Sequence, residues 1–196
     1  MPRLFISYRV ADSVHVAAAI ADRLARHYGT GNVFRDRDSL QLGEVYPAKI
    51  RRALERCDVV LALIGSRWLD VRDESGRRRL DAPGDWVRTE LRMAFERRIP
   101  VVPVLLDGTP LPRPEDLPIE LTPLCVHTFW QVRHRSFESD VRGLIDGLPD
   151  DTAGHEPSSV QPGRNTQTIN ADRSTVYVNQ GHQVITVRPD DERRRR

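Results

Sequence analysis

The stretch "VVLALIG" at residues 59–65 constrains the fold of this chain more than any other feature. Seven consecutive uncharged residues offer no polar side to water, so a strand in this place must be covered on both of its faces. Strands of that kind are typical of parallel sheets, which carry helices on both sides. The run therefore predicts a central strand of an α/β domain.

Strand and helix patterns alternate on either side of that run, over residues 1–148. The helices are predicted from apolar positions near the helical period, and the strands from short runs rich in β-branched residues. The expected strands are 3–8, 32–36, 59–65, 99–106 and 125–129, and the expected helices are 11–29, 45–58, 85–100 and 136–148. For the first helix, Asp12 or Ser13 is expected to cap the start and Gly29 the end. This order predicts a doubly wound, five-stranded parallel sheet with helices on both faces.

Ligands of doubly wound sheets bind outside the carboxyl ends of the strands. In this chain, those ends lead into the loops 7–12, 35–45, 65–85 and 107–118. The helix "DWVRTELRMAFERRIP" follows the third of these loops, and its Trp86 and Glu90 stand four residues apart, on one helical face. Two interpretations compete for Glu90: a helix-start charge at the surface, or the reactive group of a ligand pocket.

The composition changes after residue 148. Residues 149–165 are rich in Pro, Gly, Ser and Asp, and are predicted to form a flexible linker. Residues 166–188 are β-prone, with "STVYV" and "QVITV" on either side of a turn at "NQGH". Residues 189–196 are a charged terminus that ends in "RRRR". The chain is thus expected to hold one domain at 1–148 and a β-prone tail.

Composition and charge exclude several classes of function. Apolar residues make up 39 % and charged residues 30 % of the chain, and no apolar run approaches the roughly 20 residues of a membrane span. Acidic residues alternate with the arginines for a net charge of +2, which argues against nucleic acid as a partner. The start of the chain has no apolar signal region, and there are only two cysteines, so we expect a cytoplasmic protein. Neither a dinucleotide Gly-x-Gly-x-x-Gly, nor a Gly-x-Ser-x-Gly elbow, nor a metal-ligand spacing is present.

Three motifs occur together in a characteristic order: "LFISYR" at 4–9, "VFRDRDSLQLGE" at 33–44 and "DWVRTEL" at 85–91. In this respect the region 1–148 resembles a TIR domain. The resemblance implies a flavodoxin-like fold with strand order 2-1-3-4-5, in which residues 36–45 form the BB loop. Some TIR domains are adaptors that signal by self-association, and others cleave NAD.

The resemblance assigns the catalytic role to Glu90, because NAD-cleaving members carry a glutamate within Trp-x-x-x-Glu on the helix before the fourth strand. It also implies a set of substrate-binding positions: Arg9, Val10, Phe34, Asp36, Gln41, Leu42, Gly43, Trp68 and Trp86. Val10 stands where the animal enzyme has arginine, and Gln41 where it has glutamate, which weakens both assignments. For Trp68, a core aromatic is an equal alternative to a stacking surface.

The chemistry of NAD cleavage suits a single carboxylate. Nicotinamide in NAD is already a pyridinium cation and leaves as a neutral molecule, so no acid has to protonate it. Ordinary glycosidases, in contrast, use two carboxylates. One carboxylate that faces the developing positive charge on the ribose is sufficient. NAD is then the substrate, and no cofactor or metal is expected.

The tail "STVYVNQGHQVITV" is similar to the short amyloid signalling motifs at the ends of bacterial and fungal effector proteins. Its β-branched, Asn and Gln residues favour stacked strands, such as a β-arch in each rung of a fibril. A receptor that shares the motif would then be a partner. The alternatives are a disordered tail or a hairpin on the domain.

These observations lead to three expectations for function. The first is an NAD glycohydrolase that self-assembles through TIR surfaces in bacterial immunity and yields ADP-ribose or a cyclic form. The second is a non-enzymatic TIR adaptor that acts by self-association alone. The third is an effector that depletes the NAD of a host, which the self-assembling tail disfavours.

Overall fold

The computed structural model describes residues 1–35 and 46–148, and three further strands at 167–171, 174–179 and 182–186. Its main feature is a five-stranded parallel sheet in the order β2-β1-β3-β4-β5. The strands are β1 (Leu4–Ser7), β2 (Val33–Arg35), β3 (Val59–Ile64), β4 (Val101–Leu106) and β5 (Trp130–Val132). This topology confirms the doubly wound fold predicted from the sequence.

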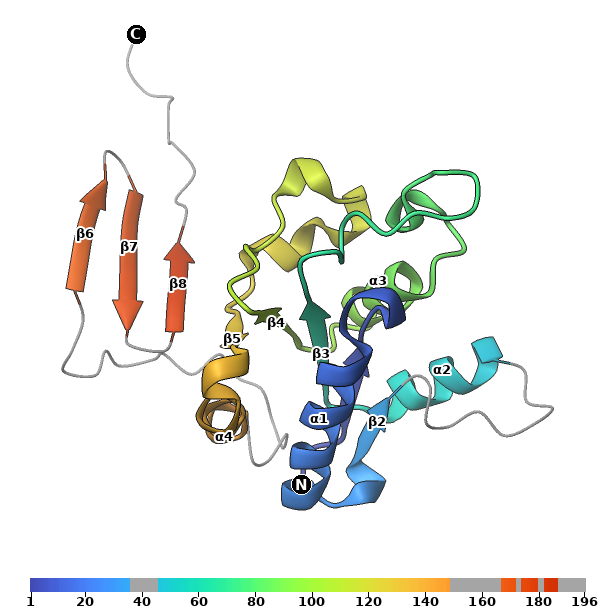
Figure 1. Ribbon diagram of the computed structural model, residues 1–196, viewed down its shortest axis with the longest axis horizontal. Coiled ribbons are helices and arrows are strands. Elements are labelled where there is room, and N and C mark those ends of the chain that lie inside the picture. The colour runs from blue at the N-terminus through green and yellow to red at the C-terminus, as the bar shows by residue number, and fades with distance from the viewer. Residues whose placement is uncertain (36–45, 149–166, 172–173, 180–181, 187–196) are drawn as a thin grey trace, which may run out of the picture.

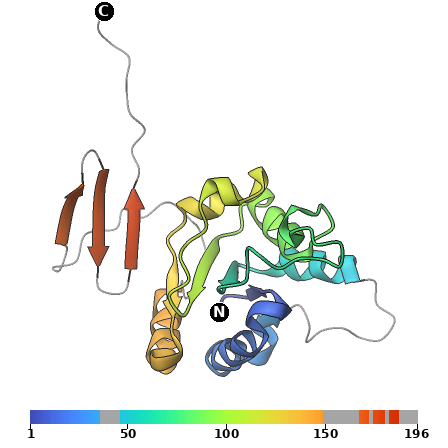
Figure 2. The ribbon, with the colours of Figure 1, turned by 45° about the horizontal axis from the view of Figure 1, so that its top comes forward.

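Four helices cover the sheet: α1 (Val10–Tyr28), α2 (Tyr46–Arg56), α3 (Trp86–Glu96) and α4 (Phe137–Gly147). Figures 1 and 2 show α1 and α4 on one side of the sheet and α2 and α3 on the other. Alternate residues of each strand serve the two layers, as the pleat requires. In β1, Leu4 and Ile6 join the core under α1 and α4, whereas Phe5 joins the core under α2 and α3. The run at 59–65 is buried on both faces, as predicted.

The start of α1 differs from the prediction. The helix begins at Val10 after Arg9, and neither Asp12 nor Ser13 caps it; Ser13 instead has non-helical angles (φ −139°, ψ 19°) that kink the first turn. The carboxylate of Asp12 is used elsewhere, because it accepts hydrogen bonds from the loop after β3. The predicted end is confirmed, since Gly29 follows the last turn with a φ of +90°.

The fifth strand was predicted at 125–129, and this was wrong: β5 is Trp130–Val132. Residues Ile119–Val126 form a 3₁₀ segment, η4, that contains Pro123. Leu121 and Leu124 are buried with a spacing of three, which is the 3₁₀ period. The first two residues of the predicted strand, Cys125 and Val126, thus belong to a short helical segment that packs on α3. The remaining 3₁₀ segments are η1 (Thr30–Asn32), η2 (Arg79–Asp81), η3 (Pro114–Asp116) and η5 (His134–Ser136).

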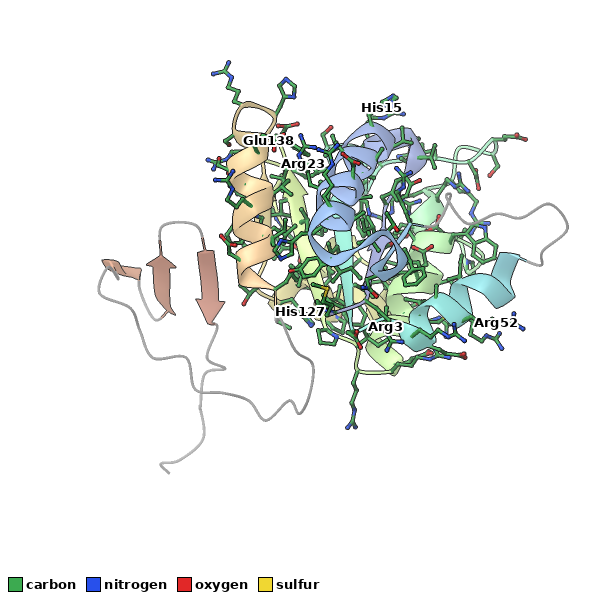
Figure 3. All side chains as sticks on the ribbon, turned by 90° about the horizontal axis from the view of Figure 1, so that it is seen from below. Arg3, His15, Arg23, Arg52, His127 and Glu138 are labelled. Carbon is green, nitrogen blue, oxygen red and sulfur yellow. The ribbon has the colours of Figure 1, made fainter. Side chains whose placement is uncertain are left out.

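Two contacts between oppositely charged side chains help to hold α4 in place. On the surface, Arg23 of α1 donates to Glu138 of α4 at 2.9 Å, and Figure 3 shows these two side chains meeting between their helices. At the end of β5, the carboxylate of Asp140 accepts from Arg133 Nε and Nη2, both at 3.0 Å, and from Ser136 Oγ at 2.7 Å. We call Arg133, Ser136 and Asp140 the β5–α4 corner.

A second sheet lies in the C-terminal part of the chain, and Figure 1 shows its three strands. These are β6 (Gln167–Ala171), β7 (Ser174–Asn179) and β8 (His182–Thr186), which pair antiparallel in that order. The two predicted runs thus form β7 and β8, which pair with each other in antiparallel order. The strand β6 was not predicted, and residues 180–181 of the predicted turn lie outside the described residues. The linker at 149–165 and the terminus at 189–196 lie outside the described residues.

Candidate functional site

Asp85 starts the α3 helix. Its Oδ1 accepts a hydrogen bond from the backbone N–H of Arg88 at 3.0 Å, which caps the helix, and its carbonyl oxygen accepts from Thr89 Oγ1 at 2.8 Å. The capping role considered for the acid in "DWVRTE" therefore belongs to Asp85. Glu90 is the fifth residue of α3 and is 1 % exposed, so it is not a surface charge at a helix start.

Glu90 meets the end of β1. The hydroxyl of Ser7 donates to Glu90 Oε2 at 2.6 Å, and both side chains are buried. Ser7 follows Phe5 on the face of the sheet that α3 covers, so β1 presents a hydroxyl to the carboxylate. A bond of this length is short for a hydrogen bond between two oxygen atoms.

A buried ion pair accompanies the contact between Ser7 and Glu90. It joins Arg9, which follows β1, to Asp85, which precedes α3. Arg9 is 5 % exposed, and its Nη1 and Nη2 donate to the two carboxylate oxygens of Asp85 at 2.9 and 3.0 Å. Its Nε donates to the carbonyl oxygen of Trp68 at 2.9 Å. One guanidinium thus joins the end of β1, the loop after β3 and the start of α3, which are the places where the sequence predicted the site.

Asp12 joins the same loop to α1. Its Oδ2 accepts from Gly65 N at 3.0 Å, and its Oδ1 accepts from Arg67 N at 2.8 Å. The carboxylate lies so close to Gly65 that a Cβ at this position would meet its atoms at 2.5–2.8 Å. A larger residue at position 65 would therefore displace the Asp12 carboxylate that bonds this loop. We call Ser7, Arg9, Trp68, Asp85 and Glu90 the α3 site, with Asp12 and Gly65 as its support.

The fold and this site can be compared with known proteins. A family model described as "TIR domain" matches residues 4–145, which is most of the chain. The chain belongs to the TIR domain family. The comparison with curated proteins gave no match.

A solved structure supports the same fold for this TIR domain. The TIR domains of the activated Roq1 resistosome, which directly recognises the pathogen effector XopQ, are similar with a TM-score of 0.52 and 13 % identity, over 74 % of this chain and 98 % of that one. A metazoan TIR-STING receptor from C. gigas gives TM-scores of 0.46 alone and 0.48 with 2′,3′-cGAMP, at 21 % and 20 % identity. These two matches cover 74 % of this chain and only 40 % and 39 % of the receptor.

Trp68 and Trp86, the two tryptophans among the predicted substrate-binding residues, are buried to different extents. Trp86 opens α3, one turn before Glu90, and is half-buried against the α2–α3 core. Trp68 is fully buried in that core, with the guanidinium carbon of Arg9 5.8 Å from its ring centroid. The structure favours the core alternative for Trp68, because its ring offers no exposed face to a ligand.

The other substrate-binding predictions fall in different places. Val10 is 41 % exposed at the first turn of α1, next to the buried Arg9. Phe34 is half-buried in β2 and packs against the same core as α3. The four BB-loop positions lie outside the described residues: Asp36, Gln41, Leu42 and Gly43. Direct contact of any of these residues with NAD stays a prediction.

A separate cavity of about 400 Å³ opens at the carboxyl ends of β3 and β4. Its lining includes Ser66, Asp70, Asp107 and Thr109, and it does not include Glu90. Gly65 also lines this cavity, and none of the five residues of the α3 site does.

Other reactive groups in the TIR domain are less suited to catalysis. Burial, together with the charge of Asp58, raises the pKa of the Cys57 thiol to about 12. Burial also raises the pKa of Cys125. Thiols with raised pKa values are poor nucleophiles at neutral pH. Within the part of the chain that the structure describes, no cluster of His, Cys, Asp or Glu is placed to hold a metal, and no helix is long and apolar enough to span a membrane.

Four contributors to the site and its support were not predicted as site residues from the sequence: Ser7, Asp12, Gly65 and Asp85. A signal existed for Ser7, which is the one polar residue of the run "LFIS" and shares its sheet face with Phe5. For Asp85, the position just before a helix was the signal. Asp12 had none, because its partners lie more than 50 residues away in the chain.

Proposed function

We propose that this TIR protein is an NAD glycohydrolase that releases nicotinamide from NAD and uses Glu90 as the catalytic carboxylate. The observation that carries the proposal is the bond from Ser7 to a buried Glu90, at the end of β1 in a TIR fold. A buried polar network can often be replaced by apolar residues of similar size without loss of stability, so a structural role alone gives little reason for a glutamate here.

The proposed reaction needs only a fixed negative charge. As the bond from ribose to nicotinamide breaks, its electron pair leaves with the neutral nicotinamide, and positive charge develops on the ribose. The Glu90 carboxylate stabilises this charge, and water or a group within the nucleotide then attacks the anomeric carbon. Attack by water gives ADP-ribose, and internal attack gives a cyclic form. Trp86, one turn before Glu90, would form a wall of the pocket.

The burial of Glu90 bears on regulation. At 1 % exposure, the carboxylate is not accessible to a dinucleotide in the single chain. We therefore propose that assembly through TIR surfaces opens or completes the site. One solved relative, the Roq1 resistosome, is described as an activated assembly. The C-terminal strands would support this assembly by stacking with other copies of the chain or with a receptor that shares the motif. The setting that we propose for this activity is bacterial defence.

The first experiment is to incubate the full-length protein with NAD at high concentration and to identify the products by mass spectrometry. We expect nicotinamide together with ADP-ribose or its cyclic form. A second arm deletes residues 160–196 and tests the shortened protein with and without an artificial oligomerisation domain. If the shortened protein is fully active when dilute and monomeric, the tail does not control activity.

The burial of Glu90 also favours a second candidate, a TIR adaptor that signals by self-association and has no enzymatic step. The substitution Glu90→Gln separates the two, because it preserves the shape of the side chain and removes its charge. An adaptor keeps its biological effect in cells that carry this variant, whereas an NAD glycohydrolase loses it.

A further inference from the structure

Ser7 stands in an unusual place for a hydroxyl. It is the last residue of β1, it is almost fully buried, and it pairs in register with Ala62 of the neighbouring β3. The preceding residue on the same face, Phe5, belongs to the apolar core. A buried hydroxyl is unfavourable unless it is hydrogen-bonded, and here it donates to Glu90 Oε2 at 2.6 Å.

Both ends of this bond are fixed to rigid elements. β1 lies inside the sheet, with β2 on one side and β3 on the other. The α3 helix is held at its first turn by the Asp85 cap and by the fork between Asp85 and Arg9. The hydroxyl therefore meets the carboxylate at a set distance and direction, and fixes the rotamer and plane of Glu90.

We propose that Ser7 is a positioning residue for Glu90, which holds the carboxylate in the orientation that faces the ribose. This inference rests on the proposed function and assigns to Ser7 a role in that same site. A hydroxyl that orients a catalytic group acts on the rate of the chemical step more than on substrate binding. Small displacements of a catalytic group are known to reduce rates by about 100-fold.

The test compares four forms of the full-length chain: wild type, Ser7→Ala, Ser7→Thr and Ser7→Val. Threonine and valine have nearly the same shape, so this pair separates the hydroxyl from the packing of the added methyl groups. All four are assayed for NAD cleavage under identical assembly conditions, and thermal unfolding of each checks the fold. We expect Ser7→Ala and Ser7→Val to lower kcat by about 10- to 100-fold, with KM within about threefold of wild type. Ser7→Thr should recover most of kcat.

The proposal is overturned if Ser7→Ala keeps the kcat of wild type, if its defect lies in KM alone, or if Ser7→Val is as active as Ser7→Thr. If the larger side chains prevent folding, the division between kcat and KM in Ser7→Ala decides. Failure of the proposed function has a different signature: wild type does not cleave NAD, or Glu90→Gln cleaves it at the rate of wild type. An active wild type with an inactive Glu90→Gln and a fully active Ser7→Ala rejects only the role of Ser7.

Discussion

The α3 site and the β5–α4 corner are built from the same parts but are buried to different extents. In each, an arginine from the end of a strand forks onto an aspartate at the start of a helix, with distances of 2.9–3.0 Å. At the corner, the Arg133 side chain is 56 % exposed, so water solvates its guanidinium group. At the α3 site, Arg9 and Asp85 are both buried, and a further carboxylate, Glu90, lies close by in the fold.

The difference shows what each arrangement is for. An exposed fork fixes α4 on β5 at little cost, because the arginine keeps most of its hydration. A buried fork costs desolvation of both ions, and apolar residues of similar size are often as stable in such a place. A site that nevertheless keeps three charged groups out of water is better explained by function than by stability.

The largest expected effect is the loss of one partner of the buried fork. Arg9→Ala removes the two hydrogen bonds of the fork from the buried Asp85 and leaves only the half-exposed Arg79, whose Nε lies 3.8 Å from Asp85 Oδ2, as a cation beside it. We expect a loss of about 3–5 kcal/mol in the free energy of unfolding. Arg133→Ala is the matched control at the corner, where water can solvate the remaining Asp140, and its loss should be clearly smaller. Urea unfolding followed by tryptophan fluorescence measures both. Equal losses of unfolding free energy in Arg9→Ala and Arg133→Ala would contradict the claim that burial distinguishes the α3 site from the β5–α4 corner.

Asp140 gives the next effect and a dependence on pH. Burial alone would raise the pKa of Asp140, but hydrogen bonds from the Arg133 and Ser136 side chains and from the Arg133 backbone N–H outweigh it and hold the pKa below the ordinary 3.8. Asp140→Ala should cost about 1.5–3 kcal/mol near pH 6. Above pH 3.8 the stabilisation is complete, and as the pH falls below this value the unfolded chain binds the proton first and the stabilisation is lost.

The corresponding measurement is urea unfolding of wild type and Asp140→Ala at pH 6 and at pH 3. The difference in unfolding free energy between the two proteins should narrow at pH 3. A difference that stays constant or widens would contradict the assigned role of the Arg133–Asp140 contact.

A glycine supports each cluster and allows a finer comparison. A Cβ at Gly65 would meet the Asp12 carboxylate at 2.5–2.8 Å, and a Cβ at Gly143 would meet the Trp130 ring at 2.6 Å. Each glycine-to-alanine substitution is expected to cost about 1–3 kcal/mol of stability. Only Gly65→Ala should also lower NAD cleavage, because it displaces the loop that carries Trp68. The assay compares both variants at a temperature where both are folded, and equal activity of the two would separate Asp12 and Gly65 from the site.

The comparison also shows what the sequence could predict. The strands β1 to β4 were predictable because each is a short apolar run in a chain where helices separate the strands. The fifth strand was misplaced by a few residues because Cys125 and Val126, the apolar start of the predicted strand, form the end of the 3₁₀ segment η4. Local patterns thus identified the layers and failed where a segment has neither the strand nor the α-helix period.

The site was predictable only in part, for a physical reason. Glu90 and Trp86 share a helical face, so their spacing alone predicted that they lie together. The contacts that hold them come from long-range pairs: Ser7 and Glu90 are 83 residues apart, and Arg9 and Asp85 are 76 residues apart. Which polar residues meet across such distances depends on the register of β1 against β3 and on the packing of α3. Neither this register nor this packing can be predicted from a local sequence pattern.

The central claim, that the Glu90 carboxylate cleaves NAD, is tested most directly by the charge of this one side chain. Glu90→Gln can still accept the hydrogen bond from Ser7, and Glu96→Gln makes the same change at an exposed position of the same helix, where Glu96 pairs with Arg92. The measurement is the rate of nicotinamide release from NAD by the assembled full-length proteins. We expect Glu90→Gln to lose at least about 100-fold in rate, a loss of the size seen when one group that stabilises transition-state charge is removed, while Glu96→Gln stays close to wild type. Nicotinamide release by Glu90→Gln at the rate of wild type would contradict the account.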